Sequence, residues 1–282
     1  MKTRTILSAF IFALLLMNAV AHEKINDVQL TKETIIRAKA SGKMILTGSK
    51  TFGDRYVAEF LDRNFIVQSD VVGTEGAFLS IYDSNGRLVH RVINDPTYPY
   101  ELAVKIKRGL NSETQYYPLL RRFNGGERSV DLLRNVIMGA DDANDVVNAP
   151  QLMEAYINQL PEAPSESELA FVATYTKHIG DPGFAYLMQR EVHLNKLADL
   201  IFQDVLLPQV SSKSFDASVW IKSAKDRYPQ SLAPHLDRML VELLEMRNDE
   251  DGLNAFIPEF MEVYKGELSD AQMAYYAGLV SK

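Results

Sequence analysis

The chain of 282 residues contains no cysteine. It therefore forms no disulfide, offers no thiolate nucleophile and has no sulfur ligand for a zinc site or an iron–sulfur cluster. Its stability has to come from buried apolar side chains, and a chain of this length can build a sizeable core. Thiol–disulfide chemistry is the activity class that the composition excludes.

Long apolar runs are also scarce. The run Ile6–Met17 follows Lys2 and Arg4 and is itself followed by the small-x-small pattern Ala19–Ala21. This order is typical of a secretory signal peptide, and the run is short for a membrane span, although an uncleaved anchor is the alternative. We expect residues 1–21 to be removed, with cleavage after Ala21, and the mature protein to be periplasmic or secreted. The absence of a cysteine after the run argues against a lipid anchor.

Basic residues are fewer than acidic ones. Removing Lys2 and Arg4 with the signal peptide takes the 30 basic residues to 28, against 37 acidic residues, so the mature chain has a net charge of −9. A strongly negative protein is repelled by nucleic acid and by anionic membranes. We therefore expect no nucleic-acid partner and no stable membrane insertion after cleavage.

Segments typical of strands and helices alternate up to about Leu110. Expected helices cover residues 30–43, 51–65 and 98–110, and expected strands cover residues 44–47, 65–72, 77–83 and 87–93. Thr31 is a candidate N-cap of the first helix and Gly42 ends it. The turn Ser84–Gly86 favours a hairpin between the last two strands. The order predicts an α/β fold, with helices packed on a mixed sheet.

After Leu110 the sequence predicts helices almost throughout. The expected helices cover residues 115–126, 129–140, 149–160, 165–179, 182–207, 215–228, 232–247, 252–264 and 269–281. Asp181–Gly183 and Asp249–Gly252 are the clearest breaks between them. No fixed repeat period emerges. A stack of helical hairpins, loosely tetratricopeptide-like, and an ordinary irregular helical domain both fit the pattern.

The first part resembles a known family. "RAKASGKMIL" followed by "FGDRYVAEFLDRNFIVQSDVV" is similar to the exported thioredoxin-like domains of Bacteroidetes-type bacteria, in which a Gly-Lys pair leads into the central strand. Phe52, Asp54 and the segments 57–61 and 64–66 match the helix and strand that follow in that family. "IYDSNGRLVHRV" resembles its terminal hairpin, and "YELAVKIKRGL" resembles its last helix. Residues 165–197 resemble helical companions of such domains. The resemblance implies a thioredoxin-like domain over residues 22–110 and an α-helical domain over residues 111–282.

The chain departs from that family at the redox site. The family's segment carrying Cys-x-x-Cys is missing after the central strand, where this chain has only a short turn. No proline stands near Ala77, where the family's cis-proline would fall, and the family's helix before that point is replaced by "GTEG". We therefore expect a truncated, degenerate domain. The position of its lost redox corner is marked by Thr47, Gly48, Ser49, Lys50, Gly76 and Ala77.

A thioredoxin-like sheet can tolerate that shortening. The strands 65–72 and 77–83 would flank the central strand and run in opposite directions, so their connection has to pass one strand, about 10 Å. Five or six extended residues reach about 18 Å. Residues 72–76 can then cross the end of the central strand and cover the place where thiol chemistry would have been.

Other candidates for chemistry have ordinary alternatives. Ser49 could replace a cysteine as nucleophile, but it lacks a Gly-x-Ser-x-Gly elbow and a nearby histidine, so we interpret it as a turn residue that caps the next helix with Thr51. His22 would begin the mature chain and could chelate copper through its amine and imidazole. The other histidines show no ligand spacing: His90, His178, His193 and His235.

Acidic and aromatic segments are similarly ambiguous. The acidic segments 139–150 and 247–252 do not align with an EF-hand loop, so we interpret them as turns or helix caps. Carboxylate pairs such as Glu166 with Glu168, or Asp54 with Glu59, fit solvated helix faces better than acid–base machinery. Trp220 and the tyrosines of "QYYP" and "AYYAG" either line a peptide groove or belong to the core.

Two functions remain open. The first is a non-catalytic protein- or peptide-binding or scaffolding module with no cofactor, whose partner is another envelope protein or peptide. The second is a non-redox enzyme with a site at the domain junction. The first expects an exposed apolar patch, the second a concave pocket with convergent polar groups and perturbed pKa values. Without either feature, a purely structural role remains.

Overall fold

A computed structural model describes residues 30–48, 54–68, 78–94, 97–210 and 216–280. The chain forms two compact units, Met1–Gln159 and Leu160–Lys282, which are taken in turn below. The first contains all the described strands and the second is helical. This confirms the expected mixed sheet combined with a helical region. The predicted division near Leu110 stays a prediction.

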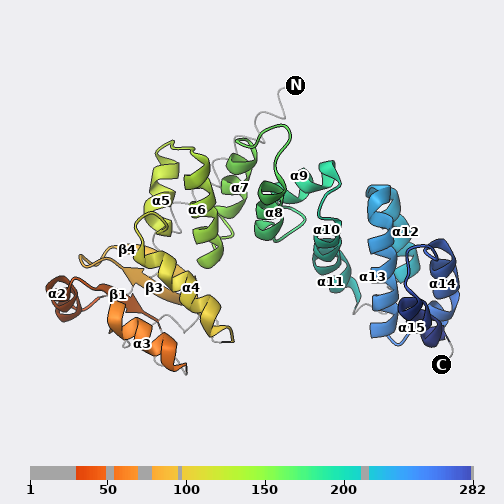
Figure 1. The fold of residues 1–282 in the computed structure, drawn as a ribbon, viewed down its shortest axis with the longest axis horizontal. Helices are drawn as coiled ribbons and strands as arrows, with labels where there is room; N and C mark the ends of the chain where they lie inside the picture. Colours follow the sequence, from red (N-terminus) through yellow and green to blue (C-terminus); the bar gives the residue numbers. More distant parts are fainter. Residues whose placement is uncertain (1–29, 49–53, 69–77, 95–96, 211–215, 281–282) are drawn as a thin grey trace. The chain divides into compact units, whose positions relative to one another are not determined.

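The first unit contains a small mixed sheet (Figure 1). Its strands are β1 (Met44–Thr47), β2 (Phe65–Gln68), β3 (Phe78–Tyr82) and β4 (Leu88–Ile93), in the order β2-β1-β3-β4. β2 runs parallel to β1, whereas β3 is antiparallel to both β1 and β4. The two strands that flank β1 therefore run in opposite directions, as the sequence predicted. The predicted crossover between them lies outside the described residues.

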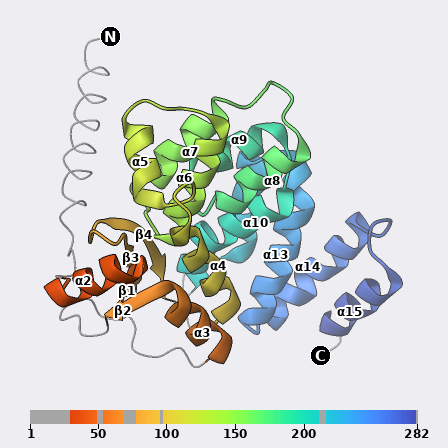
Figure 2. The same ribbon diagram turned by 60° about the vertical axis from the view of Figure 1, so that its left-hand side comes forward.

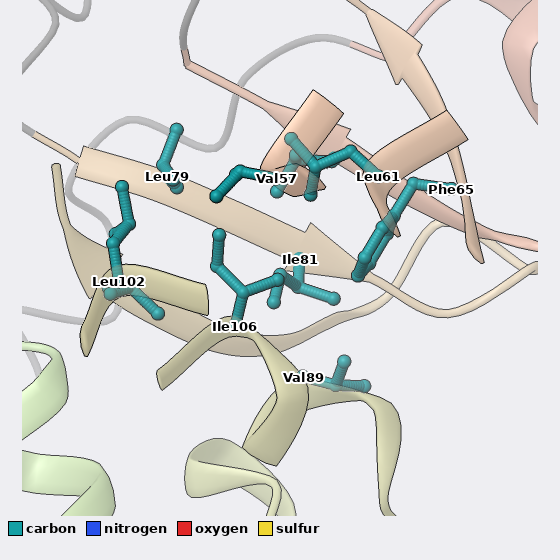
Figure 3. Close-up of a cluster of buried hydrophobic side chains, with 10 residues drawn as sticks. Val57, Leu61, Phe65, Leu79, Ile81, Val89, Leu102 and Ile106 are labelled. Atoms are coloured by element: carbon teal, nitrogen blue, oxygen red, sulfur yellow. The ribbon is translucent and has the colours of Figure 1, made fainter. Parts of the chain in front are cut away.

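The main core lies between one face of the sheet and two helices, α3 (Arg55–Asn64) and α4 (Pro99–Leu110). Figure 3 shows side chains from both helices and the sheet pointing toward one another in this layer. The buried members are Leu46, Val57, Leu61, Phe65, Leu79, Ile81, Val89, Val92, Leu102 and Ile106. The apolar positions of α3 and α4 recur at helical spacing, so each helix buries one face on the sheet.

The helix α2 (Lys32–Ser41) lies on the opposite face of the sheet (Figure 2). A smaller buried cluster lies there, in which Ala38 packs with Ile45 and Tyr82. The predicted caps of α2 are confirmed: the Thr31 side chain accepts a hydrogen bond from the Thr34 amide, and Gly42 adopts a left-handed conformation. An N-cap hydroxyl and a C-terminal glycine satisfy groups that the helix itself leaves unpaired.

The predicted cap of α3 is wrong. Asp54, not Ser49 or Thr51, precedes the first turn, and its carboxylate accepts hydrogen bonds from the amides of Tyr56 and Val57. A carboxylate caps well because it also interacts favourably with the positive end of the helix dipole.

The described part of the first unit also includes α5 (Tyr116–Asn124), α6 (Val130–Asp142) and α7 (Ala149–Ile157). α5 and α6 both pack against β4, the edge strand of the sheet. The sheet is therefore joined to helices that the sequence assigns to the second domain.

The described residues of the second unit are mostly helical. The helices are α8 (Glu166–Tyr175), α9 (Pro182–Arg190), α10 (Leu194–Ile201), η1 (Phe202–Leu206), α11 (Leu207–Val210), α12 (Ala217–Arg227), η2 (Gln230–Leu232), α13 (Ala233–Met246), α14 (Glu250–Val263) and α15 (Asp270–Val280). The single helix predicted over residues 182–207 is wrong. Glu191 and His193 have φ angles of 54° and 53°, which end α9 and start α10, and η1 is a π-helix. No helix among the described residues is long and apolar enough to span a membrane.

Candidate functional site

The predicted redox corner is only partly described. Thr47, at the end of β1, is 1% exposed, and its hydroxyl has no hydrogen-bond partner among the described residues. Gly48 has a φ of 115°, and a Cβ atom there would lie 2.1 Å from the carbonyl oxygen of Phe78. Ser49, Lys50, Gly76 and Ala77 lie outside the described residues. β1 therefore ends in a turn that glycine alone fits well, pressed against the start of β3.

Polar side chains follow the end of β1 across the whole sheet. Thr47 pairs in register with Gln68 of β2 and Ser80 of β3, and Ser80 pairs with Arg91 of β4. The Thr31 amide donates to Oε1 of Gln68 at 3.0 Å, so this row is tied to the start of α2. Its groups are hydroxyls, an amide and a guanidinium. The row lacks an imidazole or carboxylate that could act as a general base.

A second polar cluster is buried between β4, α4 and α6. Arg108 donates through Nε to Oδ2 of Asp142 at 2.6 Å and through a terminal nitrogen to Oδ1. Nε2 of His90 lies 3.4 Å from Oδ2 of the same carboxylate. The His90 and Asp142 side chains have no exposed surface, and the Arg108 side chain is 23% exposed. The sequence showed no metal-ligand spacing for His90, and in the structure its Nε2 faces the carboxylate that Arg108 also contacts.

The contacts of His90 indicate the tautomer of its neutral ring. The Tyr116 amide donates to Nδ1 at 3.2 Å, so Nδ1 carries a lone pair and no proton. The remaining proton of a neutral imidazole then lies on Nε2 and faces Asp142. The Tyr116 hydroxyl donates to Oδ2 of Asp145 at 2.7 Å, which extends the polar contacts to the turn before α7.

Two glycines let the backbones approach closely enough for these contacts. A Cβ atom at Gly109 of α4 would lie 2.4 Å from Cδ1 of Ile81 and 3.1 Å from Cβ of His90. A Cβ atom at Gly139 of α6 would lie 2.8 Å from Cβ of Tyr116. Both helices therefore pack nearer to their neighbours than a helix with side chains at these positions could.

The electrostatics of the cluster favour a charged carboxylate. Burial of Asp142 opposes ionisation, but the polar contacts from His90 and Arg108 outweigh it and lower the pKa of the carboxyl. Burial and the neighbouring Asp145 raise the pKa of the Tyr116 hydroxyl. Asp142 is thus a buried anion held by Arg108 and His90, and Tyr116 stays protonated.

This arrangement supports structure better than catalysis. The convergent polar groups and shifted pKa values that an active site needs are present. However, a general base has to reach the proton that it abstracts. The fully buried His90 and Asp142 offer no surface to a substrate. The cluster acts instead as a joint between the sheet and the helices that follow it.

The second unit has its own buried polar group. Asp237 of α13 is 3% exposed, forms an ion pair with Lys225 of α12, and accepts a hydrogen bond from the Tyr264 hydroxyl at 2.6 Å. Burial and this bond raise the pKa of Tyr264. The group joins three helical segments and has the same internal role as the cluster around Asp142.

The remaining histidines lie apart from one another. His178 is 3.3 Å from Asp204 of η1, and His193 is 3.6 Å from Glu166. Within the part of the chain that the structure describes, no group of three or more metal-ligating side chains occurs. His22 lies outside that part.

The prediction that the acidic segments are turns or caps is confirmed in part, because Asp142 of the first segment is instead the buried partner of Arg108. Asp145 accepts hydrogen bonds from the amides of Val147 and Asn148 before α7, and Asp249 accepts one from the Gly252 amide at the start of α14. Glu168 belongs to a capping box with Ser165. These carboxylates compensate unpaired backbone amides of helix N-termini.

An open groove lies between α14 and α15, with a volume of about 400 Å³. Its apolar lining residues are Ile257, Pro258 and Met261 of α14 and Met273, Ala277 and Val280 of α15. The exposed Glu262 and Lys265 complete the lining. α15 has no fully buried residue, although its sequence is mostly apolar. Sequence reasoning weighed the tyrosines of this helix as groove residues but did not find the methionine-lined groove, which depends on how the two helices pair.

The other aromatic residues that the sequence suggested for a groove differ in burial. Tyr116 is fully buried in the core, whereas Tyr275 is 51% exposed and donates to Glu245 of α13 at 2.8 Å. This bond fastens α15 to α13. Trp220 lies half-buried on α12.

Comparisons with known proteins give no further identification. No family model matches the chain, and neither curated proteins nor solved structures yield a match.

Proposed function

We propose that the chain is an exported, non-redox protein-binding module, in which a degenerate thioredoxin-like domain is followed by a helical region. The observation that carries the proposal is the open, methionine-lined groove between α14 and α15. Methionine side chains adapt to different apolar partners, and grooves between helices accept partner segments. The buried polar clusters around Asp142 and Asp237, in contrast, make their contacts within the protein.

The thioredoxin-like assignment is supported by the connectivity of the sheet. A helix and a Gly-Lys pair precede β1, an aspartate-capped helix follows it, and β2 and β3 flank it in opposite directions. The β3–β4 hairpin turns through Gly86, with a φ of 83°, and α4 ends the segment. These features agree with the family pattern that the sequence resembles. The lack of cysteine is what makes the domain degenerate.

A non-redox enzyme with a site at the junction of the predicted domains is the alternative. The cluster of His90, Arg108 and Asp142 lies at that junction, next to Leu110. The full burial of His90 and Asp142 favours a structural role over a catalytic one. Enzyme activity would require an opening of α6 away from β4 to expose these groups.

Site-specific crosslinking in the organism that makes the protein tests the proposal. A photo-crosslinking amino acid at Ala277, which lines the groove, should capture a reproducible partner, whereas the same group at Ala274, exposed on α15 outside the groove lining, should not. Equal capture from both positions, or none from the groove, would contradict the proposal. The purified protein should also reduce insulin no faster than buffer, and its N-terminal residue should be His22.

A further inference from the structure

We propose that the groove between α14 and α15 binds a basic amphipathic helix of a partner protein. This inference rests on the proposed binding function and adds the chemistry of the partner. It depends on the spacing of the lining residues and on the charge around them.

The lining residues form two apolar stripes at helical spacing. Met273, Ala277 and Val280 are at positions i, i+4 and i+7 of α15, so they share one face of that helix. Ile257 and Met261 are one turn apart on α14. A groove between two paired helices, with an apolar stripe on each, is the surface that a third helix covers in helical hairpin stacks.

The groove is therefore incomplete as a helical layer. In a stack of hairpins, each pair buries its open face against the next pair. α15 leaves its apolar residues half-buried or exposed, so it can still bury area against another helix. The partner should present apolar residues at i, i+3, i+4 and i+7.

The charge of the hairpin determines the sign of that partner. Between residues 250 and 280 the sequence has six acidic residues and one basic residue, Lys265. All six acidic side chains are exposed: Glu250, Asp251, Glu259, Glu262, Glu267 and Asp270. Of these residues only Glu262 and Lys265 line the groove, so the negative charge acts from the rest of the hairpin. A hairpin with net negative charge attracts a helix whose polar face carries lysine or arginine and repels an acidic one. It also disfavours a second copy of the same acidic hairpin.

The test measures binding of synthetic peptides to the full mature chain by fluorescence anisotropy. The probe is a capped peptide of about 16 residues, long enough for a marginally stable helix, with leucines at i, i+3, i+4 and i+7 and lysines on the other face. One control peptide replaces lysine with glutamate. A second keeps the composition but scrambles the order, which removes the apolar stripe and keeps the charge.

Matched variants separate the groove from general attraction between charges. Ala277→Trp fills the groove, whereas Ala274→Trp adds the same side chain at an exposed position of α15 outside the groove lining. Met261→Glu places a charge in the groove, whereas Val263→Glu places it at a position of α14 that is 64% exposed and does not line the groove. We expect the two groove variants to weaken binding of the basic amphipathic peptide about tenfold or more, and the two controls to change it little.

Three outcomes would overturn the inference. They are equal binding of the acidic or scrambled peptide, equal effects of the groove and control variants, and a dimer of the wild-type chain that Ala277→Trp dissociates. The last would assign the groove to a second copy. If the groove captures a partner in cells but the partner segment is not a basic helix, the inference fails while the proposed function stands.

Discussion

Replacement of Asp142 tests whether the buried cluster is a structural joint. Asp142→Ala removes the carboxylate that Arg108 and His90 both contact, and leaves a guanidinium and an Nε2–H group without it. Breaking a buried ion pair costs about 3–5 kcal/mol. The Arg108 side chain is 23% exposed and can regain part of its hydration, so we expect a loss near the lower limit, about 3 kcal/mol. Asp142→Asn keeps the shape and one acceptor, and should cost about 2 kcal/mol.

The assay has to report on the first unit. Trp220 is the only tryptophan and lies in the second unit, so its fluorescence is the wrong probe. Hydrogen exchange of peptides from β4 and α6 during urea titration measures the opening of the joint itself. Glu154→Ala, at an exposed position of α7, is the control and should change stability by less than about 0.5 kcal/mol. If Asp142→Ala costs no more than this control, the cluster does not hold the sheet to the helices.

Replacement of Asp142 by asparagine should also change how the stability depends on pH. Because the pKa of Asp142 is lowered in the folded state, its ionised form stabilises the fold. That contribution is complete above the unfolded value, about pH 4, and is lost as the pH falls through the lowered folded value. Asp142→Asn should therefore flatten the decline in stability below about pH 4. An unchanged acid profile would indicate that another carboxylate governs acid unfolding.

Further variants test the corner and the second unit. Gly48→Ala should destabilise the first unit by more than about 2 kcal/mol in urea, because of the positive φ and the close carbonyl. Gly278→Ala, a helical glycine of α15 with nothing within 4 Å of the added Cβ, should instead stabilise the second unit by about 0.5–1 kcal/mol. If Gly48→Ala leaves the free energy of unfolding unchanged, the turn after β1 can relax to accept a side chain. Tyr264→Phe should cost about 1–2 kcal/mol, since it removes the hydrogen bond to Asp237, and Trp220 fluorescence can follow it. A loss below about 0.5 kcal/mol would show that Lys225 alone satisfies that carboxylate.

Local features of the fold could be predicted from the sequence. The caps Thr31 and Gly42, the turn through Gly86 and the positions of the four strands follow from short patterns that involve neighbouring residues. The break near Glu191 could not, since no glycine or proline marks it. Non-glycine residues rarely adopt the left-handed backbone found at Glu191 and His193, so short sequence patterns do not predict it.

The polar cluster could not be predicted for a different reason. His90 and Tyr116 are 26 residues apart, and Arg108 and Asp142 are 34 residues apart. Such pairs leave no periodicity in the sequence, and each residue alone is compatible with a surface position. The methionine-lined groove could not be predicted for the same reason, because it exists only when α14 and α15 pair.

The cluster also affects how the protein reaches its folded state during synthesis. The chain is made from its N-terminus, so β4 and α4 exist before α6 is complete. Until Asp142 emerges, His90 and Arg108 lack the carboxylate that both contact, and β4 is covered by α4 but not by α5 and α6. A nascent chain that ends near Leu110 therefore presents an edge strand without two of its packing helices, which is the type of surface that holding chaperones bind.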